Sequence, residues 1–149
     1  MSLLTGPMGL TKVGEENGWH RYGVAKSGTP VERASGTFIE LKEFPDERRG
    51  SWGVGSIHHV AWRVTDSAHE IQVRDAVRQH GTHTTDQIDR FWCTSVYFKE
   101  PGGALFELAT DGPGFGRDED MAHLGETLVL PPWFESKREE IAAGLPKLK

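Results

Sequence analysis

The order of elements between residues 57 and 110 constrains the fold more than any other feature of the sequence. Residues 57–64 are rich in β-branched and aromatic side chains, which favours a strand. Ser67 and Glu70 then have the Ser-x-x-Glu spacing of a capping box, which predicts a helix that runs to about His80. The first half of this stretch is therefore expected to be a strand followed directly by a helix.

The second half of the same stretch has the pattern of a small antiparallel sheet. Residues 94–99 and 104–110 alternate apolar and polar side chains on either side of a Glu-Pro-Gly-Gly turn. A weaker strand is expected within residues 82–88, after Gly81, which stands where a helix commonly stops. The complete order is strand, helix and three strands, βαβββ, which belongs to the α+β class.

Short apolar runs separated by glycine and proline also occur outside this stretch. Residues 19–24 and 37–42 are the clearest strand candidates of the first part, and the polar, glycine-rich residues 44–55 are expected to connect it to the βαβββ unit. Ser136 and Glu139 repeat the capping-box spacing and predict a short helix near the C-terminus. The predicted units are residues 1–50, 51–117 and 118–149.

Side-chain alternation predicts which strand residues face a common site. Successive side chains of a strand point to opposite faces, so the apolar residues of each predicted strand share one face, which the helix can cover. The opposite faces then carry His59, Tyr97 and Glu107. Imidazole nitrogen and carboxylate oxygen are donors for divalent metal ions such as iron, manganese and zinc, and a tyrosine hydroxyl can donate a proton.

Each of these three residues also has an ordinary structural explanation. A single histidine in a strand is more often structural than a metal ligand. A carboxylate on a half-exposed strand is usually solvated, and Tyr97 could be a partly buried core residue with a hydrated hydroxyl. Periodicity alone leaves the structural and the functional interpretation open.

Two segments carry a resemblance to a known family: residues 55–64, Gly-Ser-Ile-His-His-Val-Ala-Trp-Arg-Val, and residues 95–108. They are similar to the first strand and the final hairpin of the βαβββ module in the vicinal-oxygen-chelate superfamily, which includes glyoxalases, bleomycin-resistance proteins and extradiol dioxygenases. The resemblance implies that His59 and Glu107 are metal ligands. It also implies that Tyr97, ten residues before the glutamate, is a catalytic residue that acts on a bound catechol.

Further segments resemble two-module ring-cleaving dioxygenases that act on hydroquinone- or catechol-type aromatics. These are residues 109–115 and 130–141, together with Asp89-Arg90 before the hairpin. The resemblance implies paired βαβββ modules that form an open cup of mixed sheet, with the first strand and most of the helix of module one missing. Residues 92–94, Trp-Cys-Thr, differ from the aromatic-basic pattern that is commoner at this place in these dioxygenases. This difference puts the expected local substrate contacts in doubt.

In the family, the strand that is missing here supplies a further histidine ligand. Glu40, which by resemblance holds the place of Glu107 in the truncated module, is a candidate for an additional ligand. His83 and Arg63 are further candidates for the metal site or its pocket, and His20 is a weaker one. The implied cofactor is Fe(II) or Mn(II), with Zn and Ni as other divalent candidates.

The function that the resemblance implies is metal-dependent cleavage of an aromatic ring, with a small aromatic molecule and O2 as substrates. Two alternatives stay open: a glyoxalase-type isomerase or lyase on the same scaffold, and a non-catalytic module for ligand binding or dimerisation. A missing strand would leave an unpaired sheet edge, which favours pairing with a second chain and predicts a homodimer.

Charge and composition argue against other classes of partner. The formal net charge of −5 disfavours sequence-independent binding to nucleic acid. No apolar run approaches the roughly 20 residues that span a bilayer, so no membrane association is expected. Cys93 is the single cysteine, which fits a reducing compartment, and the expected location is cytoplasmic.

Overall fold

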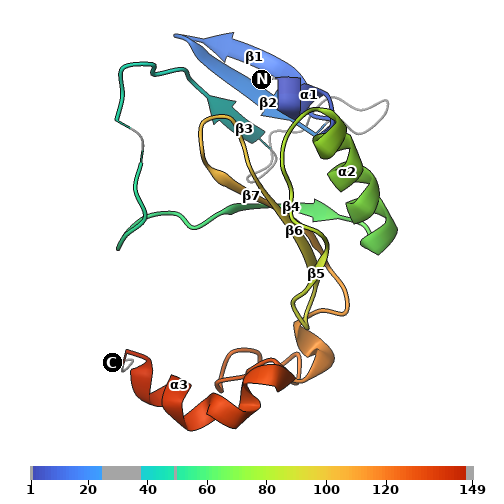
Figure 1. The fold of residues 1–149 in the computed structure, drawn as a ribbon, viewed down its shortest axis with the longest axis vertical. Helices are drawn as coiled ribbons and strands as arrows, with labels where there is room; N and C mark the ends of the chain where they lie inside the picture. Colours follow the sequence, from blue (N-terminus) through green and yellow to red (C-terminus); the bar gives the residue numbers. More distant parts are fainter. Residues whose placement is uncertain (1, 25–37, 49, 147–149) are drawn as a thin grey trace.

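The computed structural model describes residues 2–24, 38–48 and 50–146, and its strands form two separate sheets (Figure 1). The first sheet is antiparallel and has the order β1-β2-β3. Its strands follow a short helix: α1 Ser2–Thr5, β1 Thr11–Glu16, β2 Trp19–Gly23 and β3 Phe38–Leu41. The strands expected at residues 19–24 and 37–42 are confirmed within the described residues, and Thr37 lies outside them.

The second sheet contains the βαβββ unit that the sequence predicts. Its order is β4-β7-β6-β5, with β4 parallel to β7 and the other pairs antiparallel. The elements are β4 Val60–Val64, α2 Ser67–Gln79, β5 Ile88–Asp89, β6 Thr94–Lys99 and β7 Leu105–Thr110. The predicted α+β class is confirmed. The first strand begins at Val60 and not at Ile57, so His58 and His59 lie just before β4.

The ends of α2 differ in how well the sequence predicts them. The expected cap residue, Ser67, is wrong, because the preceding Asp66 is the N-cap and its carboxylate accepts a 2.8 Å hydrogen bond from the backbone N–H of His69. The stop at Gly81 is confirmed by its φ of 93° and by the hydrogen bond from the N–H of Thr82 to the carbonyl of Val77. These are features of a Schellman motif, in which a left-handed glycine ends the helix.

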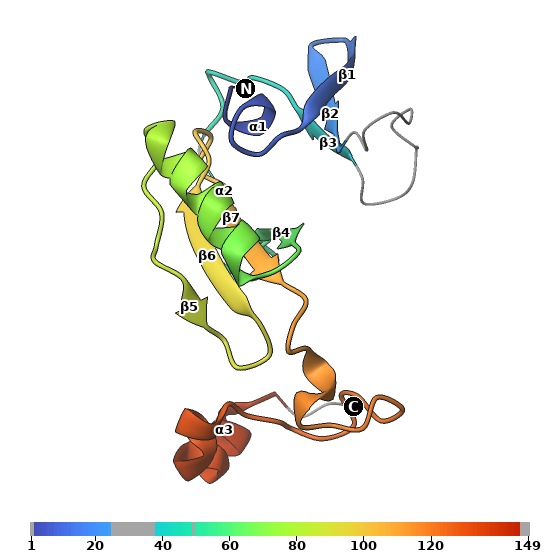
Figure 2. The same ribbon diagram turned by 90° about the vertical axis from the view of Figure 1, so that its right-hand side faces the viewer.

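The helix α2 lies across one face of the second sheet, over β6 and β7 (Figure 2). The buried apolar residues of these two strands are Val96, Phe98, Phe106 and Leu108. Together with Val77 of α2 they form the core face that alternation predicts. Val60 is an exception with 38% exposure, because it opens a strand at the edge of the sheet.

The short helix α1 joins the same core. Leu3 and Leu4 are buried, and the hydroxyl oxygen of Ser2 lies 3.0 Å from Nε2 of His80 at the end of α2. The first sheet is therefore tied to the βαβββ unit through α1.

The segment that follows β7 forms an extension away from both sheets (Figures 1 and 2). Its elements are two 3₁₀ helices and one α-helix: η1 Phe115–Arg117, η2 Pro132–Lys137 and α3 Arg138–Gly144. The capping box expected at Ser136 is wrong, since Ser136 lies inside η2 and the N-cap of α3 is Lys137, which makes no side-chain cap. None of the described residues in the range 111–146 is buried. No helix in the described part of the chain is long and apolar enough to cross a membrane.

The two sheets share a strand arrangement, with one difference at an edge. In the second sheet the last strand, β7, lies between β6 and the parallel strand β4. In the first sheet the last strand, β3, pairs with β2 alone among the described strands. Among the described strands, none lies beside β3 at the position that corresponds to β4.

Candidate active site

The register of the second sheet brings three predicted residues together on the face opposite α2. Tyr97 of β6 is paired with Glu107 of β7, and Ala61 of β4 is the parallel partner of Glu107. His59 precedes Ala61 by two residues and therefore points to the same side as Glu107. The strand pairing thus directs the phenol and the carboxylate toward one place, and the residues that lead into β4 bring the imidazole of His59 to them.

The carboxylate of Glu107 lies between the other two side chains. Its Oε1 atom accepts a 2.6 Å hydrogen bond from the hydroxyl of Tyr97, and its Oε2 atom lies 2.8 Å from Nε2 of His59. The Glu107 side chain is only 8% exposed, whereas that of His59 is 34% exposed. The carboxylate of Glu107 is therefore more shielded from solvent than the imidazole of His59.

The phenol of Tyr97 keeps its proton more tightly than an ordinary tyrosine. Burial raises the pKa of Tyr97, and the hydrogen bond to Glu107 raises it further. Hydrogen bonding with Ser95 and Arg90 acts in the opposite direction but is outweighed. At neutral pH Tyr97 is a protonated donor, aimed at the carboxylate.

The second ring nitrogen of His59 is also engaged. A 2.7 Å hydrogen bond joins Nδ1 of His58 and Nδ1 of His59, and the His58 ring lies 5.1 Å from the ring of Trp52. When one ring nitrogen of a histidine is held in this way, the ring orientation and the tautomer are fixed by that partner. His58 thus orients His59.

Arg90 is a further site residue, which strand alternation does not predict. Its guanidinium carbon lies 5.0 Å from the centre of the Tyr97 ring, and its side chain is exposed. Among the described residues, no carboxylate forms an ion pair with Arg90. The position of Arg90 between a short strand and the hairpin was its only signal in the sequence. Its contact with Tyr97 depends on the path of the loop, which the sequence pattern does not predict.

The other candidate residues lie in contacts of their own. Glu40 forms an ion pair with Arg21 at 2.6 Å, and Arg63 forms one with Asp111 at 2.8 Å. His83 is exposed. In the described part of the chain, no group of three His, Cys, Asp or Glu side chains is close enough to hold one metal ion. The structure therefore brings two of the expected donors, His59 and Glu107, together. Neither Glu40 nor His83 joins them to form a group of three.

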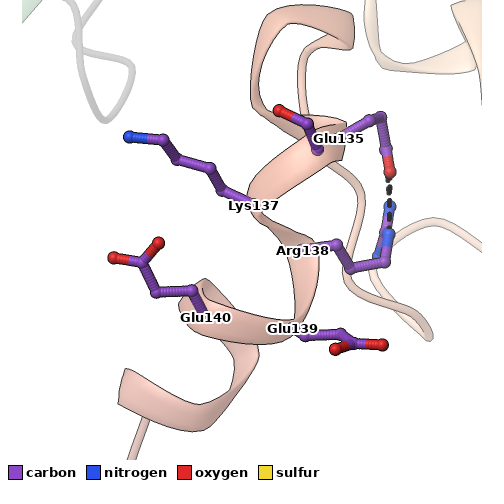
Figure 3. Close-up of a pocket in the computed structure, with 6 residues that line it drawn as sticks. Glu135, Lys137, Arg138, Glu139 and Glu140 are labelled. Carbon is purple, nitrogen blue, oxygen red and sulfur yellow. Dashed lines mark hydrogen bonds and ion pairs between the residues drawn. The ribbon is translucent and has the colours of Figure 1, made fainter.

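Two open hollows on the surface lie apart from this site. One is lined by Glu16, Asn17, Trp19 and Glu40 at one end of the first sheet. The other is lined by residues 135–140 of the extension, where Arg138 pairs with Glu135 (Figure 3). Neither hollow includes His59, Tyr97 or Glu107, so the candidate site is defined here by the contacts of these three side chains.

Comparison with known proteins shows which proteins this chain resembles. The chain is 41% identical over 148 residues to the "Putative ring-cleaving dioxygenase MhqE" of Bacillus subtilis, and it covers 46% of that protein. It is 29% identical over 143 residues to the chlorohydroquinone/hydroquinone 1,2-dioxygenase of Sphingobium indicum, of which it covers 42%. The crystal structure of a "putative dioxygenase" from Bacillus subtilis superposes with a TM-score of 0.81 at 38% identity, over 95% of this chain and 43% of the other.

A more distant structure shows the same scaffold. The fosfomycin resistance protein FosX of Listeria monocytogenes superposes with a TM-score of 0.53 at 14% identity, over 73% of this chain and 78% of that protein. The chain resembles ring-cleaving dioxygenases and has the fold of vicinal-oxygen-chelate proteins. This confirms the family resemblance and the fold class, although no family model matches the sequence. The chain spans less than half the length of these dioxygenase relatives.

Proposed function

We propose that His59 and Glu107 bind a divalent metal ion, Fe(II) or Mn(II), and that this site supports O2-dependent cleavage of a catechol- or hydroquinone-type ring. The observation that carries the proposal is the 2.8 Å separation of His59 Nε2 and Glu107 Oε2, with the hydroxyl of Tyr97 bonded to the same carboxylate. The dioxygenase names of the relatives supply the reaction class.

The donor geometry fits a shared ion. Protein nitrogen and oxygen ligands lie about 2.1 Å from a divalent transition metal, so two donors at right angles would be about 3 Å apart. The two atoms of this site are separated by close to that distance. One imidazole and one carboxylate leave most positions of an ion to water, substrate and oxygen, and they hold it less tightly than three protein ligands would.

A bound ferrous or manganous ion would supply a place where an aromatic diol and O2 meet. The chain's own residues then have distinct tasks. Tyr97 presents its hydroxyl proton beside the site and can donate a hydrogen bond to a substrate oxygen. His58 keeps the His59 ring in place. Arg90, which is exposed and close to Tyr97, adds a positive charge that attracts an anionic oxygen on the ring of the substrate.

Metal retention and oxygen uptake test the proposal together. Purified protein is loaded anaerobically with Fe(II) or Mn(II), dialysed, and analysed for metal, and oxygen uptake is then followed with catechol and with hydroquinone. We expect one metal ion per chain and substrate-dependent oxygen uptake, both lost in His59→Ala. His123→Ala is the matched control, because His123 lies in the extension and contacts Glu126. Wild-type protein that retains metal but consumes no oxygen with either substrate would contradict ring cleavage.

A second candidate function is binding of an aromatic ligand without catalysis. The observation that favours it is the presence of two, and not three, potential ligands around the candidate site in the described residues. A protein that retains no stoichiometric metal yet binds hydroquinone would support this alternative. Activity with Ni(II) or Zn(II) that needs no oxygen would instead indicate an isomerase or lyase of the glyoxalase type.

Within the described residues β3 pairs with β2 alone, and this edge supports a further part of the proposal, a homodimer. An unpaired strand presents backbone N–H and C=O groups that can pair with another chain. Light scattering on the purified protein would measure the mass in solution, and a monomer at micromolar concentration would contradict dimer formation.

A further inference from the structure

We propose that Arg117 of the C-terminal extension is a positioning residue for the candidate active site, acting through Phe91 on the β5–β6 loop, residues 90–93. This loop carries Arg90, which lies against Tyr97. The catalytic consequence rests on the proposed function, whereas the structural coupling can be tested without it.

Arg117 holds Phe91 by two contacts at once. Its guanidinium carbon lies 4.0 Å from the centre of the Phe91 ring, and its Nη1 atom donates a 2.6 Å hydrogen bond to the Phe91 carbonyl. A guanidinium over an aromatic face is attracted by the electrons of the ring, and the planar group can donate at its edge at the same time. One side chain of the extension thus fixes both the ring and the backbone of Phe91.

The backbone of Phe91 needs such support. Its φ angle of 73° lies in the left-handed region, which is uncommon for a residue other than glycine and costs free energy for a bulky side chain. Within the loop, the N–H of Phe91 donates to the carboxylate of Asp89 at 2.7 Å, and the N–H of Arg90 donates to the Cys93 carbonyl at 2.9 Å. This unusual turn determines the direction in which the neighbouring Arg90 side chain leaves the loop.

Trp92 connects the loop to the extension by independent contacts. Its indole N–H donates to Asp118 at 2.8 Å, and its carbonyl accepts from the N–H of Gly114 at 2.8 Å. Trp133 of η2 also stacks edge-on against Phe91, with ring centres 6.3 Å apart. Because residues 111–146 contain no buried side chain among those described, these loop contacts account for much of the attachment of the extension. The chain of contacts therefore runs from Arg117 through Phe91 and Arg90 to Tyr97.

Fluorine NMR can observe this coupling directly, because the sequence contains only two tyrosines, Tyr22 and Tyr97. Protein labelled with 3-fluorotyrosine would give one signal from the site and one from Tyr22, which is buried in the core. The Tyr97→Phe variant assigns the two signals. We expect Arg117→Gln to shift or broaden the Tyr97 signal and to leave the Tyr22 signal in place.

Two further variants separate positioning from a general loss of structure. Arg117→Lys keeps the positive charge but not the planar group, so it is expected to return the Tyr97 signal only part of the way toward its wild-type position. Arg138→Gln is the matched control, because Arg138 also belongs to the extension but contacts Glu135 and the Leu128 carbonyl (Figure 3). An unmoved Tyr97 signal in folded Arg117→Gln would overturn the inference. If Arg117→Gln also displaces the Tyr22 signal, Arg117→Met, which keeps the length of the side chain, replaces it, and an unmoved Tyr97 signal there overturns the inference in the same way.

Kinetics give the second readout. With Fe(II) and hydroquinone, Arg117→Gln is expected to raise KM by about fivefold, the factor that one exposed cation–π contact supports, with kcat little changed. A fall in kcat at constant KM would overturn the assignment of Arg117 to positioning Arg90. Absence of turnover in the wild type would contradict the proposed function, while the NMR result would still decide the coupling.

Discussion

Replacing Tyr97 with phenylalanine removes one hydroxyl group and tests whether it holds the Glu107 carboxylate in place. The hydroxyl donates to Oε1 of Glu107 at 2.6 Å, and the Glu107 side chain is 8% exposed, so water has little access to replace the lost donor. A hydrogen bond to a charged group contributes about 1.5–3 kcal/mol, and a buried acceptor without a partner costs a similar amount. We therefore expect the free energy of unfolding to fall by about 1.5–3 kcal/mol.

Urea unfolding followed by circular dichroism measures this difference. A lower midpoint with an unchanged slope would show that stability changed and that the extent of unfolding did not. A double-mutant cycle with Glu107→Gln then isolates the pairwise contribution. If Tyr97→Phe unfolds at the wild-type midpoint, the reasoning about the shielded carboxylate is refuted. Where the protein shows ring cleavage, the same variant should lower kcat by about 10²- to 10⁴-fold if Tyr97 donates the proton.

Three further predictions follow from contacts described above. Asp66→Ala should destabilise the protein by about 1 kcal/mol in urea unfolding, whereas Ser67→Ala should have a smaller effect, because Asp66 caps α2; equal effects would contradict this assignment. Burial and the bond to Glu107 raise the pKa of Tyr97, so the folded protein holds this proton more tightly than the unfolded chain, and the stabilisation is full below about pH 10 and lost as the pH rises through the raised pKa. The wild-type unfolding midpoint should accordingly fall more steeply above that pH than the midpoint of Tyr97→Phe, and parallel curves would argue against the shift. His58→Ala should weaken metal affinity by about 10- to 100-fold in equilibrium dialysis, and an unchanged affinity would show that the contact with His59 does not support metal binding.

Local patterns were sufficient to predict most of the βαβββ unit. The strand at residues 94–99 has the bounds that alternation predicts, and Gly81 marks the end of α2 because its backbone angle is one that favours glycine. The beginning of α2 was misplaced by one residue, since Asp66 and Ser67 are both good cap residues and only the path of the chain decides between them. The cap predicted at Ser136 is wrong for a related reason. The 3₁₀ helix η2 already begins at Pro132, so Ser136 lies inside a helix and not at the start of one.

The site was predictable to the extent that it depends on strand faces. Alternation directs His59, Tyr97 and Glu107 to one side, and the register of the strands then brings their polar atoms within hydrogen-bonding distance. Arg90 and Arg117 were not predictable in this way. Their positions depend on a left-handed backbone at a phenylalanine, for which the sequence carries no signal, and on contacts between segments that are far apart in the chain.

The ion pair between Arg21 and Glu40 makes the two sheets chemically unequal. These residues are partners across β2 and β3, just as Tyr97 and Glu107 are partners across β6 and β7. A guanidinium already neutralises the first carboxylate, so a cation arriving there would have to displace a permanent positive charge. Of these two carboxylates, Glu40 thus pairs with a guanidinium, whereas Glu107 contacts an imidazole and a phenol. Replacing Arg21 with tyrosine would give both sheets the same cross-strand pair, a tyrosine opposite a glutamate.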